Sequence, residues 1–220
     1  MSPLVLYYFA PSAPCRIALS TIRCLDLDVE LRIVDLFKKE QLQEEFVKLN
    51  PQHTVPTLVD DGFVLIESRA IAIYLIEKNF QSGHSLYPKD AKERALINQK
   101  LQFDCGTLYP RIRAVCLPIL FGGQTKISDD NRQKLFDAVE FLNTFLEGKT
   151  YVAGSEQPTI ADLSIFTSIA NIVELGADLS KYPNVVSWYE TCKQLPGSAE
   201  NVVGAKEFAG KITSLWQDKL

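Results

Sequence analysis

The sequence predicts a small α/β domain over residues 1–82 and an all-helical domain over residues 90–220. Short β-rich segments alternate with helical ones in the first 80 residues, whereas no strand pattern follows residue 90. Residues 81–90, QSGHSLYPKD, are rich in Gly, Ser and Pro, as is typical of a linker. A chain of 220 residues is long enough for two modest cores.

The first half of the α/β domain is predicted to be a β-α-β unit. Residues 4–9 form a β-rich run, and residues 15–24 carry apolar side chains at helical spacing after a proline-rich turn. Residues 29–34 alternate between apolar and polar side chains, which predicts a second strand. The unit therefore implies two parallel strands joined by a right-handed crossover.

The second half is predicted to be β-β-α, after a short polar helix over residues 39–48. Strands 56–60 and 63–66 flank Asp61-Gly62, a dipeptide typical of two-residue hairpin turns. A helix over residues 67–79 completes a sheet of mixed direction with helices on its faces.

Five helical segments are predicted in the second domain, over residues 91–120, 130–147, 159–173, 184–194 and 205–219. Pro110 and Pro118 should kink or split the first of them. Thr159 and Asp162 have the spacing of a capping box, with Asp in place of the usual Glu. We therefore expect Asp162 to serve folding and to take no part in chemistry.

Composition argues against several classes of function. The formal net charge is −4 and no basic run is present, so a nucleic-acid partner is not expected. No apolar stretch approaches the ~20 residues of a membrane helix, and no targeting signal is recognisable. Five cysteines without a CxxC pair, with only two histidines, predict neither a disulfide framework nor a metal site. The expected protein is cytoplasmic and metal-free.

Three short segments could carry chemistry. Ser12 follows a strand and opens a helix, where a hydroxyl can bind an anion or can simply cap the helix. Val55-Pro56 precedes a strand: a cis bond there would expose backbone to an extended peptide, although trans bonds are far more frequent. Glu67 and Ser68 open another helix and could receive an ammonium and a carboxylate, or form a solvated cap.

In this order, the segments resemble the thioredoxin-like N-terminal domain of cytosolic glutathione transferases, followed by the all-helical C-terminal domain of that family. The resemblance covers essentially the whole chain and is closest to the insect delta and epsilon classes, epsilon above all. The motifs that carry it are Ser12-Ala13-Pro14-Cys15-Arg16, Asn50-Pro51-Gln52-His53-Thr54-Val55-Pro56-Thr57-Leu58, Glu67-Ser68-Arg69-Ala70-Ile71 and Ser85-Leu86-Tyr87-Pro88.

The resemblance implies that Ser12 is the catalytic residue and donates a hydrogen bond to the glutathione sulfur. A free thiol has a pKa of about 8.5, and lowering it by two units needs about 2.7 kcal/mol. A charge-assisted hydrogen bond contributes about 1.5–3 kcal/mol, and the helix N-terminus adds to it. The size of the effect therefore suits one hydroxyl at this position.

The resemblance also implies a glutathione site, with glutathione as co-substrate. In it, the Val55 backbone would pair with the cysteinyl part beside a cis Pro56, while Glu67 and Ser68 hold the γ-glutamyl end. Gln41 replaces a histidine common in these classes, so weaker binding at the glycyl carboxylate is expected. The implied glutathione-binding residues are Gln41, His53, Val55, Pro56, Glu67, Ser68 and Arg69.

The second substrate, a small hydrophobic electrophile, is expected in an apolar pocket of the helical domain. Arg113 would favour an anionic or polarised group on that substrate. The implied lining residues are Phe9, Leu36, Tyr109, Arg113, Leu117, Leu120, Phe121 and Phe208. By resemblance, the protein is a homodimer that conjugates glutathione to xenobiotics or lipid-peroxidation products, an activity that can confer insecticide resistance.

Other functions remain open at this stage. Residues 27–38 are similar to an epsilon-class member linked to steroid hormone synthesis, so the protein could instead bind a sterol or act as a non-catalytic carrier. That member has an acidic residue in its pocket helix, where this chain has Ile112 or Arg113. A thiol oxidoreductase would need a cysteine at Ser12, and a serine hydrolase would need a GxSxG turn around it.

Overall fold

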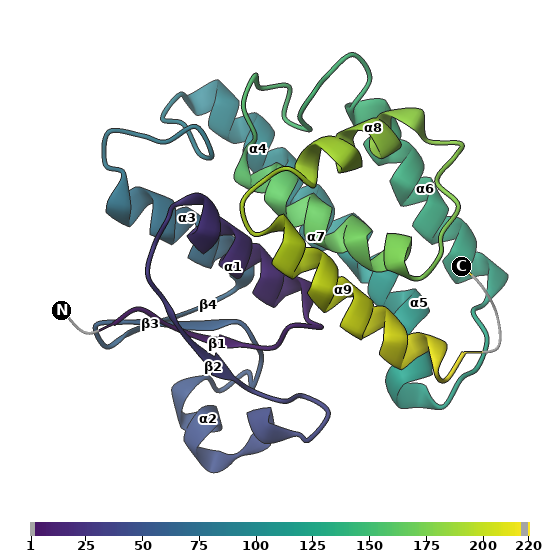
Figure 1. The fold of residues 1–220 in the computed structure, drawn as a ribbon, viewed down its shortest axis with the longest axis horizontal. Helices are drawn as coiled ribbons and strands as arrows, with labels where there is room; N and C mark the ends of the chain where they lie inside the picture. Colours follow the sequence, from purple (N-terminus) through teal and green to yellow (C-terminus); the bar gives the residue numbers. More distant parts are fainter. Residues whose placement is uncertain (1–2, 217–219) are drawn as a thin grey trace.

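The computed structural model describes residues 3–216 and residue 220, and it shows a four-stranded sheet followed by a bundle of helices (Figure 1). The sheet half contains β1 (Val5–Tyr8), α1 (Ala13–Cys24), β2 (Glu30–Ile33), a 3-10 turn (Glu40–Leu42), α2 (Glu44–Leu49), β3 (Thr57–Asp60), β4 (Phe63–Ile66) and α3 (Ser68–Asn79). The fold class predicted from the sequence is confirmed: the first part is thioredoxin-like and the second is helical.

The strands lie in the order β2-β1-β3-β4. β1 and β2 are parallel, with Val5 opposite Glu30, and the remaining pairs are antiparallel. Asp61 and Gly62 both have positive φ, as the tight hairpin between β3 and β4 requires. The predicted crossover and hairpin are therefore both present.

Helices α1 and α3 pack against each other on the side of the sheet that faces the helical bundle, whereas α2 lies on the opposite side (Figure 1). Phe46 of α2 makes an edge-on ring contact with Tyr7 of β1 at 5.6 Å between centroids. Helices thus lie on both faces of the sheet, although the edge strands β2 and β4 stay largely exposed, and the α1 side forms the contact with the second half of the chain.

The helical part consists of α4 (Ala91–Phe103), a π-helical turn (Asp104–Leu108), α5 (Tyr109–Gly122), α6 (Asp129–Phe145), α7 (Ile160–Glu174), α8 (Pro183–Cys192) and α9 (Ser198–Thr213). Helix α7 is the centre of the bundle, because almost all of its residues are buried. It packs against both α1 and α9, and α9 also lies along α1. The two halves of the chain therefore share one continuous core.

Two helix predictions need correction. The segment 91–120 stays helical throughout: a π-helical turn at residues 104–108 comes directly before Tyr109 and Pro110, and Pro118 lies inside α5 without splitting it. The last helix was predicted to begin at Ala205, but α9 begins at Ser198 because Gly197, at φ 78°, turns the chain into the helix there. It ends at Thr213, so the helix predicted over residues 214–216 is wrong, and the last predicted residues, 217–219, lie outside the described residues.

Asp162 occupies the predicted capping position at the start of α7. Its carboxylate accepts hydrogen bonds from Thr159 N and Thr159 Oγ1, both at 2.9 Å. It also accepts from Val152 N at 2.8 Å and from Trp188 Nε1 at 2.9 Å. Asp162 therefore joins three segments of the bundle, in agreement with the structural role expected for it.

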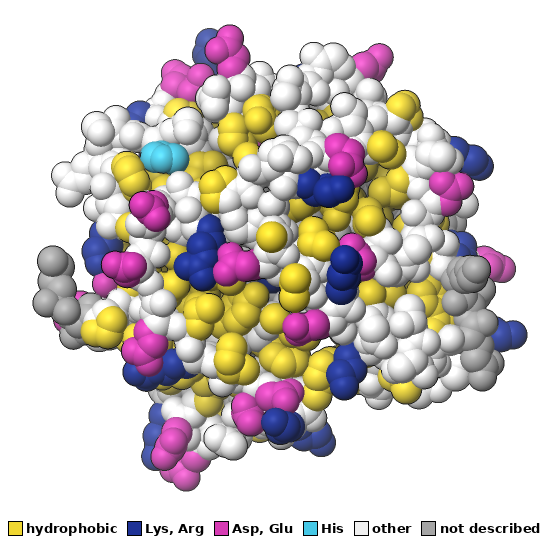
Figure 2. All heavy atoms as spheres, in the orientation of Figure 1, with side chains coloured by type: hydrophobic (Ala, Val, Ile, Leu, Met, Phe, Trp, Pro, Cys, Tyr) yellow, Lys and Arg dark blue, Asp and Glu magenta, His cyan; other side chains and the backbone are white. Residues whose placement is uncertain are grey.

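The surface shows no sign of a strongly basic region on the face in view, where acidic and basic side chains are interspersed (Figure 2). Among the helices of the described chain, none combines the length and the hydropathy of a bilayer span. Within residues 3–216, no group of three or more His, Cys, Asp or Glu side chains is arranged to hold a metal ion.

Candidate active site

Strand register brings the three predicted segments to one end of the sheet. Tyr7 of β1 lies opposite Thr57 of β3, and Thr57 lies opposite Ile66 of β4. The turn after β1, the residues before β3 and the residues after β4 therefore meet at the same end of the sheet. Ser12, Val55-Pro56 and Glu67-Ser68 belong to these three connections.

Ser12 is the residue immediately before α1, and its side chain does not cap that helix. Its main-chain N–H donates to Phe9 O at 2.9 Å, and its carbonyl accepts from Arg16 N at 3.2 Å. The half-buried hydroxyl lines a cavity instead. Because this hydroxyl makes no capping hydrogen bond and lies at the positive end of a helix, it is positioned to donate to an anion.

The cavity beside Ser12 has a volume of about 110 Å³ and lies between the β1–α1 turn, α5 and α9. All eight residues expected to line an electrophile pocket surround it. The structure adds Pro11, Ala13, Phe37, Ile112, Cys116 and Asn171 to the lining. Phe37 was missed because it lies in a loop, where periodicity carries no information, and Asn171 because its polar side chain sits on a helix predicted to be core.

The walls of the cavity are mostly apolar, with a few polar groups. Phe9 and Phe37 meet edge-on, with their ring centroids 5.4 Å apart. Burial raises the pKa of Tyr109 to about 12, so its hydroxyl stays neutral at physiological pH. Arg113 is exposed at the rim and makes no ion pair or hydrogen bond within the described residues. Such a pocket suits an apolar molecule that carries one polar or anionic group.

The loop before β3 is held from inside by Asn50. The Asn50 side-chain amide donates to Thr54 O at 2.9 Å and to Thr57 Oγ1 at 3.0 Å. The Val55-Pro56 bond is cis, which decides between the two conformations left open by the sequence. Val55 is buried, whereas His53, at φ 45°, is exposed at the surface of the loop. An extended peptide could therefore reach this loop from the His53 side.

Gln41 lies in the 3-10 turn after β2 and is half-buried. Its Oε1 atom is buried and has no hydrogen-bond partner in the described chain. Buried amide oxygens are normally paired, so this oxygen is an exception.

Glu67 and Ser68 stand at the start of α3. Glu67 is exposed and adopts a φ of 69°, an uncommon conformation for a residue with a side chain. Ser68 is buried as the first residue of the helix. Strained backbone of this kind is concentrated at ligand sites, because surrounding structure must maintain it.

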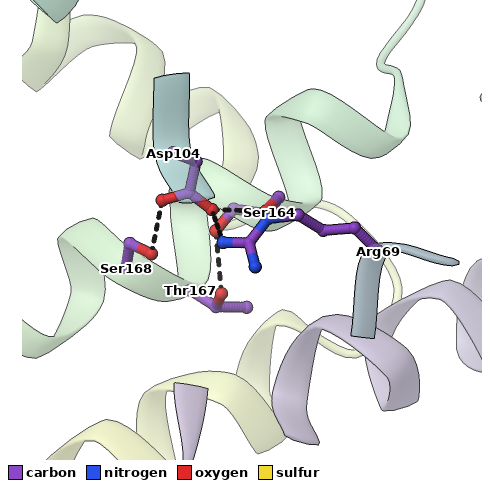
Figure 3. A network of polar contacts seen from close by, with 5 residues as sticks. All are labelled: Arg69, Asp104, Ser164, Thr167 and Ser168. Atoms are coloured by element: carbon purple, nitrogen blue, oxygen red, sulfur yellow. Dashed lines mark hydrogen bonds and ion pairs between the residues drawn. The ribbon is translucent and has the colours of Figure 1, made fainter. Parts of the chain in front are cut away.

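Arg69 points away from solvent and forms an ion pair with Asp104 of the π-helical turn (Figure 3). Asp104 is fully buried and also accepts from Ser164 Oγ and, at 2.8 Å, from Ser168 Oγ. Arg69 Nε has no partner within the described chain. The Arg69 side chain thus connects the start of α3 to the π-helical turn and, through Asp104, to α7.

Cys15, three residues after Ser12, is fully buried. Burial raises the pKa of its thiol to about 12, against a smaller opposite effect of a hydrogen bond with Ser12. The Cys15 thiol is therefore neutral and shielded at physiological pH. The geometry gives no support to dithiol exchange at this position.

The arrangement defines a class of protein: a thioredoxin-like domain with a serine and a cis-proline at one end of its sheet, and a helical domain that closes an apolar cavity over them. A family model described as glutathione S-transferase, N-terminal domain matches residues 6–83. A second, described as glutathione S-transferase, C-terminal domain, matches residues 115–196. The chain belongs to the glutathione transferase family.

Solved structures of glutathione transferases are similar to this chain over nearly its whole length. Glutathione S-transferase unclassified 2 from Bombyx mori is 46% identical, covers 99% of this chain and 100% of its own, and superposes with a TM-score of 0.93. A delta-class glutathione transferase from Nilaparvata lugens is 46% identical over 97% of this chain and 100% of its own, with a TM-score of 0.91. A glutathione transferase homologue from Drosophila mojavensis with bound glutathione is 38% identical over 98% of both chains, with a TM-score of 0.92.

The similar structures include insect enzymes of the delta class, at 46% identity, and of the epsilon class, at 40%, which confirms the resemblance to these two classes without favouring epsilon. The protein is accordingly a glutathione transferase and an enzyme. Glutathione is its substrate by family membership.

Proposed function

We propose that Ser12 stabilises the glutathione thiolate and that the thiolate attacks a hydrophobic electrophile held in the adjacent cavity. The observation that carries this proposal is that the Ser12 hydroxyl does not cap α1 and instead lines the apolar cavity. The hydroxyl acts as a hydrogen-bond donor, so it is neither nucleophile nor base. The electrophile sits against α5 and α9, within reach of the sulfur.

Glutathione would lie across the edge of the sheet. The Val55 backbone before the cis Pro56 pairs with the cysteinyl part, while Glu67 and Ser68 hold the γ-glutamyl ammonium and carboxylate. The Gln41 amide and His53 contact the glycyl end. Arg69 supports this arrangement indirectly, because its ion pair with Asp104 fixes the start of α3.

The enzyme would act as a cytoplasmic homodimer, with the sites near the interface, on xenobiotics or lipid-peroxidation products. The domain boundary is placed between residues 82 and 90. Sedimentation of the purified enzyme tests the oligomeric state directly, and a monomer at micromolar concentration would contradict it.

The experiment that tests the central claim compares the wild type with Ser12→Ala. We expect the pKa of bound glutathione, followed by thiolate ultraviolet absorbance, to rise by about one to two units. Conjugation of a chloro-nitrobenzene acceptor at neutral pH should fall about tenfold or more. Ser68→Ala serves as the matched control: glutathione affinity should fall, but the thiol pKa of the bound tripeptide should stay at the wild-type value. An unchanged thiol pKa in Ser12→Ala refutes the assigned role.

A panel of sterols and insecticide-like ligands separates detoxification from a specialised role. Inhibition by many unrelated apolar compounds supports detoxification. Selective competition by sterols, with little conjugation of the generic acceptor, supports a binder of an endogenous hydrophobic ligand.

A further inference from the structure

Arg16 of α1 is a buried cation for which the described chain supplies no carboxylate. The side chain is only 1% exposed, yet it forms no ion pair in the described part of the chain. Burying a charge is costly unless the charge is paired, so buried arginines normally face a carboxylate. An unpaired one needs an explanation.

The partners of the Arg16 guanidinium are all neutral. Nε donates to Asn201 Oδ1 of α9 at 2.8 Å, and Nη1 donates to Ala10 O at 2.8 Å. Nη2 donates to Asn171 Oδ1 and to Thr167 O, both on α7. Each of the three guanidinium nitrogen atoms donates at least one hydrogen bond, but no partner neutralises the positive charge.

The use of asparagine at position 201 is informative. Asn201 presents its oxygen to Arg16, while its Nδ2 is buried without any partner in the described chain. An aspartate has the same shape and would form an ion pair with Arg16 without orphaning an amide. The chain therefore hydrogen-bonds the guanidinium through amides where a carboxylate of equal size would fit.

The neutral partners place the charge next to the site. Ala10 belongs to the turn that carries Ser12, and Asn171 lines the cavity into which the Ser12 hydroxyl opens. Gly204 of α9 approaches the same turn so closely that an added Cβ would lie 2.4 Å from Ala10 O and 2.7 Å from Arg16 Cδ. The turn and the Arg16 side chain are thus packed together against α9.

The titratable groups around Arg16 are Tyr8 of β1, Cys15 of α1, Tyr109 of α5 and Tyr189 of α8. Burial raises the pKa of each of them, so all four are neutral at physiological pH. None of them compensates the charge. At Tyr109, which lines the cavity, the positive charges of Arg113 and then of Arg16 oppose the effect of burial on the pKa, so the charge of Arg16 contributes to the potential there.

We propose that Arg16 supplies the positive counter-charge of the glutathione thiolate, and that Asn171 and Asn201 hold its guanidinium without neutralising it. This inference rests on the proposed function of the site and adds a second source of thiolate stabilisation to Ser12. Arg16 acts through space and contacts neither substrate.

Titration of bound glutathione by thiolate absorbance, with the full-length enzyme, tests the proposal. Asn201→Asp adds a negative charge beside Arg16. We expect it to raise the thiol pKa by about half a unit or more, and to raise the melting temperature at the same time. Asn201→Ala is the matched control: it removes the same hydrogen bond without adding charge, so the thiol pKa should stay at the wild-type value.

Arg16→Lys and Arg16→Met extend the test. Both lose hydrogen bonds and should be less stable, but only Arg16→Met should raise the thiol pKa, by about one unit. If Arg16→Met does not fold, Asn201→Asp decides alone. A wild-type thiol pKa in Asn201→Asp, with the expected rise in Ser12→Ala, overturns the Arg16 proposal and leaves the role of Ser12 standing. A wild-type thiol pKa in Ser12→Ala, together with a raised thiol pKa in Asn201→Asp, refutes the role of Ser12 instead.

Discussion

The side-chain amide of Asn131, on α6, donates to the main-chain carbonyl of Ala114, on α5, at 3.2 Å. In a regular α-helix the N–H of residue 118 donates to the carbonyl of residue 114, but Pro118 has no N–H to donate. Asn131 therefore replaces the missing helical hydrogen bond from a neighbouring helix. The part of α5 beyond this point carries Leu120 and Phe121 of the cavity wall.

Asn131→Ala is expected to lower the free energy of unfolding by about 1 kcal/mol, since an exposed carbonyl can turn to water. In a Pro118→Ala background, residue 118 supplies its own N–H, so the same substitution should have almost no effect. Urea unfolding of the two single variants and the double variant measures the coupling. Equal losses in both backgrounds would show that Asn131 does not compensate for Pro118.

Two glycines of α9 should respond to alanine in opposite directions. Gly204→Ala puts a methyl group 2.4 Å from Ala10 O, so we expect a loss of about 1–3 kcal/mol or more and a displaced Ser12 turn. At Gly210 an added Cβ meets nothing within 4 Å, so Gly210→Ala should gain about 0.5–1 kcal/mol from helix propensity. Thermal unfolding and glutathione affinity report both effects. Equal stability of the two variants would contradict the close approach of α9.

Asp162→Asn should be severely destabilised. Each carboxylate oxygen accepts two donors, so an amide must direct its own N–H groups at one of those pairs. The expected loss is about 3 kcal/mol or more. Trp188→Phe removes only the Nε1 donor and should cost about 1.5–3 kcal/mol, because the bond is made to a charged group. Chemical denaturation measures both, and a stable Asp162→Asn protein would argue against the network.

Thiol reactivity should be governed by burial. Burial raises the pKa of Cys15 and of Cys116 to about 12, so both remain protonated at pH 8. Cys105 is exposed, and we expect it to be alkylated first. Mass spectrometry after iodoacetamide treatment at pH 8, native and in denaturant, distinguishes the sites. Fast native labelling of Cys15 would contradict the buried position of its thiol.

The ion pair of Asp60 with Lys78 gives a pH-dependent contribution to stability. Burial alone would raise the pKa of Asp60, but hydrogen bonds from Lys78 and Tyr74 outweigh it, and the net pKa is lowered. A depressed carboxyl pKa stabilises the fold above the unfolded value of about 4 and loses that effect as pH falls. Asp60→Asn should therefore reduce the difference in stability between pH 6 and pH 3. An unchanged difference would show that Asp60 contributes nothing to it.

Local sequence patterns were sufficient for most of the elements. The strand within residues 29–34, the Asp61-Gly62 turn and the Thr159–Asp162 capping box each depend on neighbours in the chain, and each is present in the structure, although all four residues of β2 are exposed. The Gly197 turn that starts α9 and the π-helical turn after Phe103 were missed, because packing against other helices decides where those segments bend.

The sequence by itself determined the fold class and the segments around Ser12, Val55-Pro56 and Glu67-Ser68, because short-range periodicity and turn chemistry specify them. The motifs in those segments carried the resemblance to the family. Only the tertiary structure decided that Pro56 is cis, that Arg69 pairs with Asp104, that Phe37 closes the cavity and that Arg16 meets amides instead of a carboxylate. The side-chain contacts among these join residues up to 185 positions apart. The energies of such contacts depend on burial and on the identity of a distant partner, neither of which any local pattern contains.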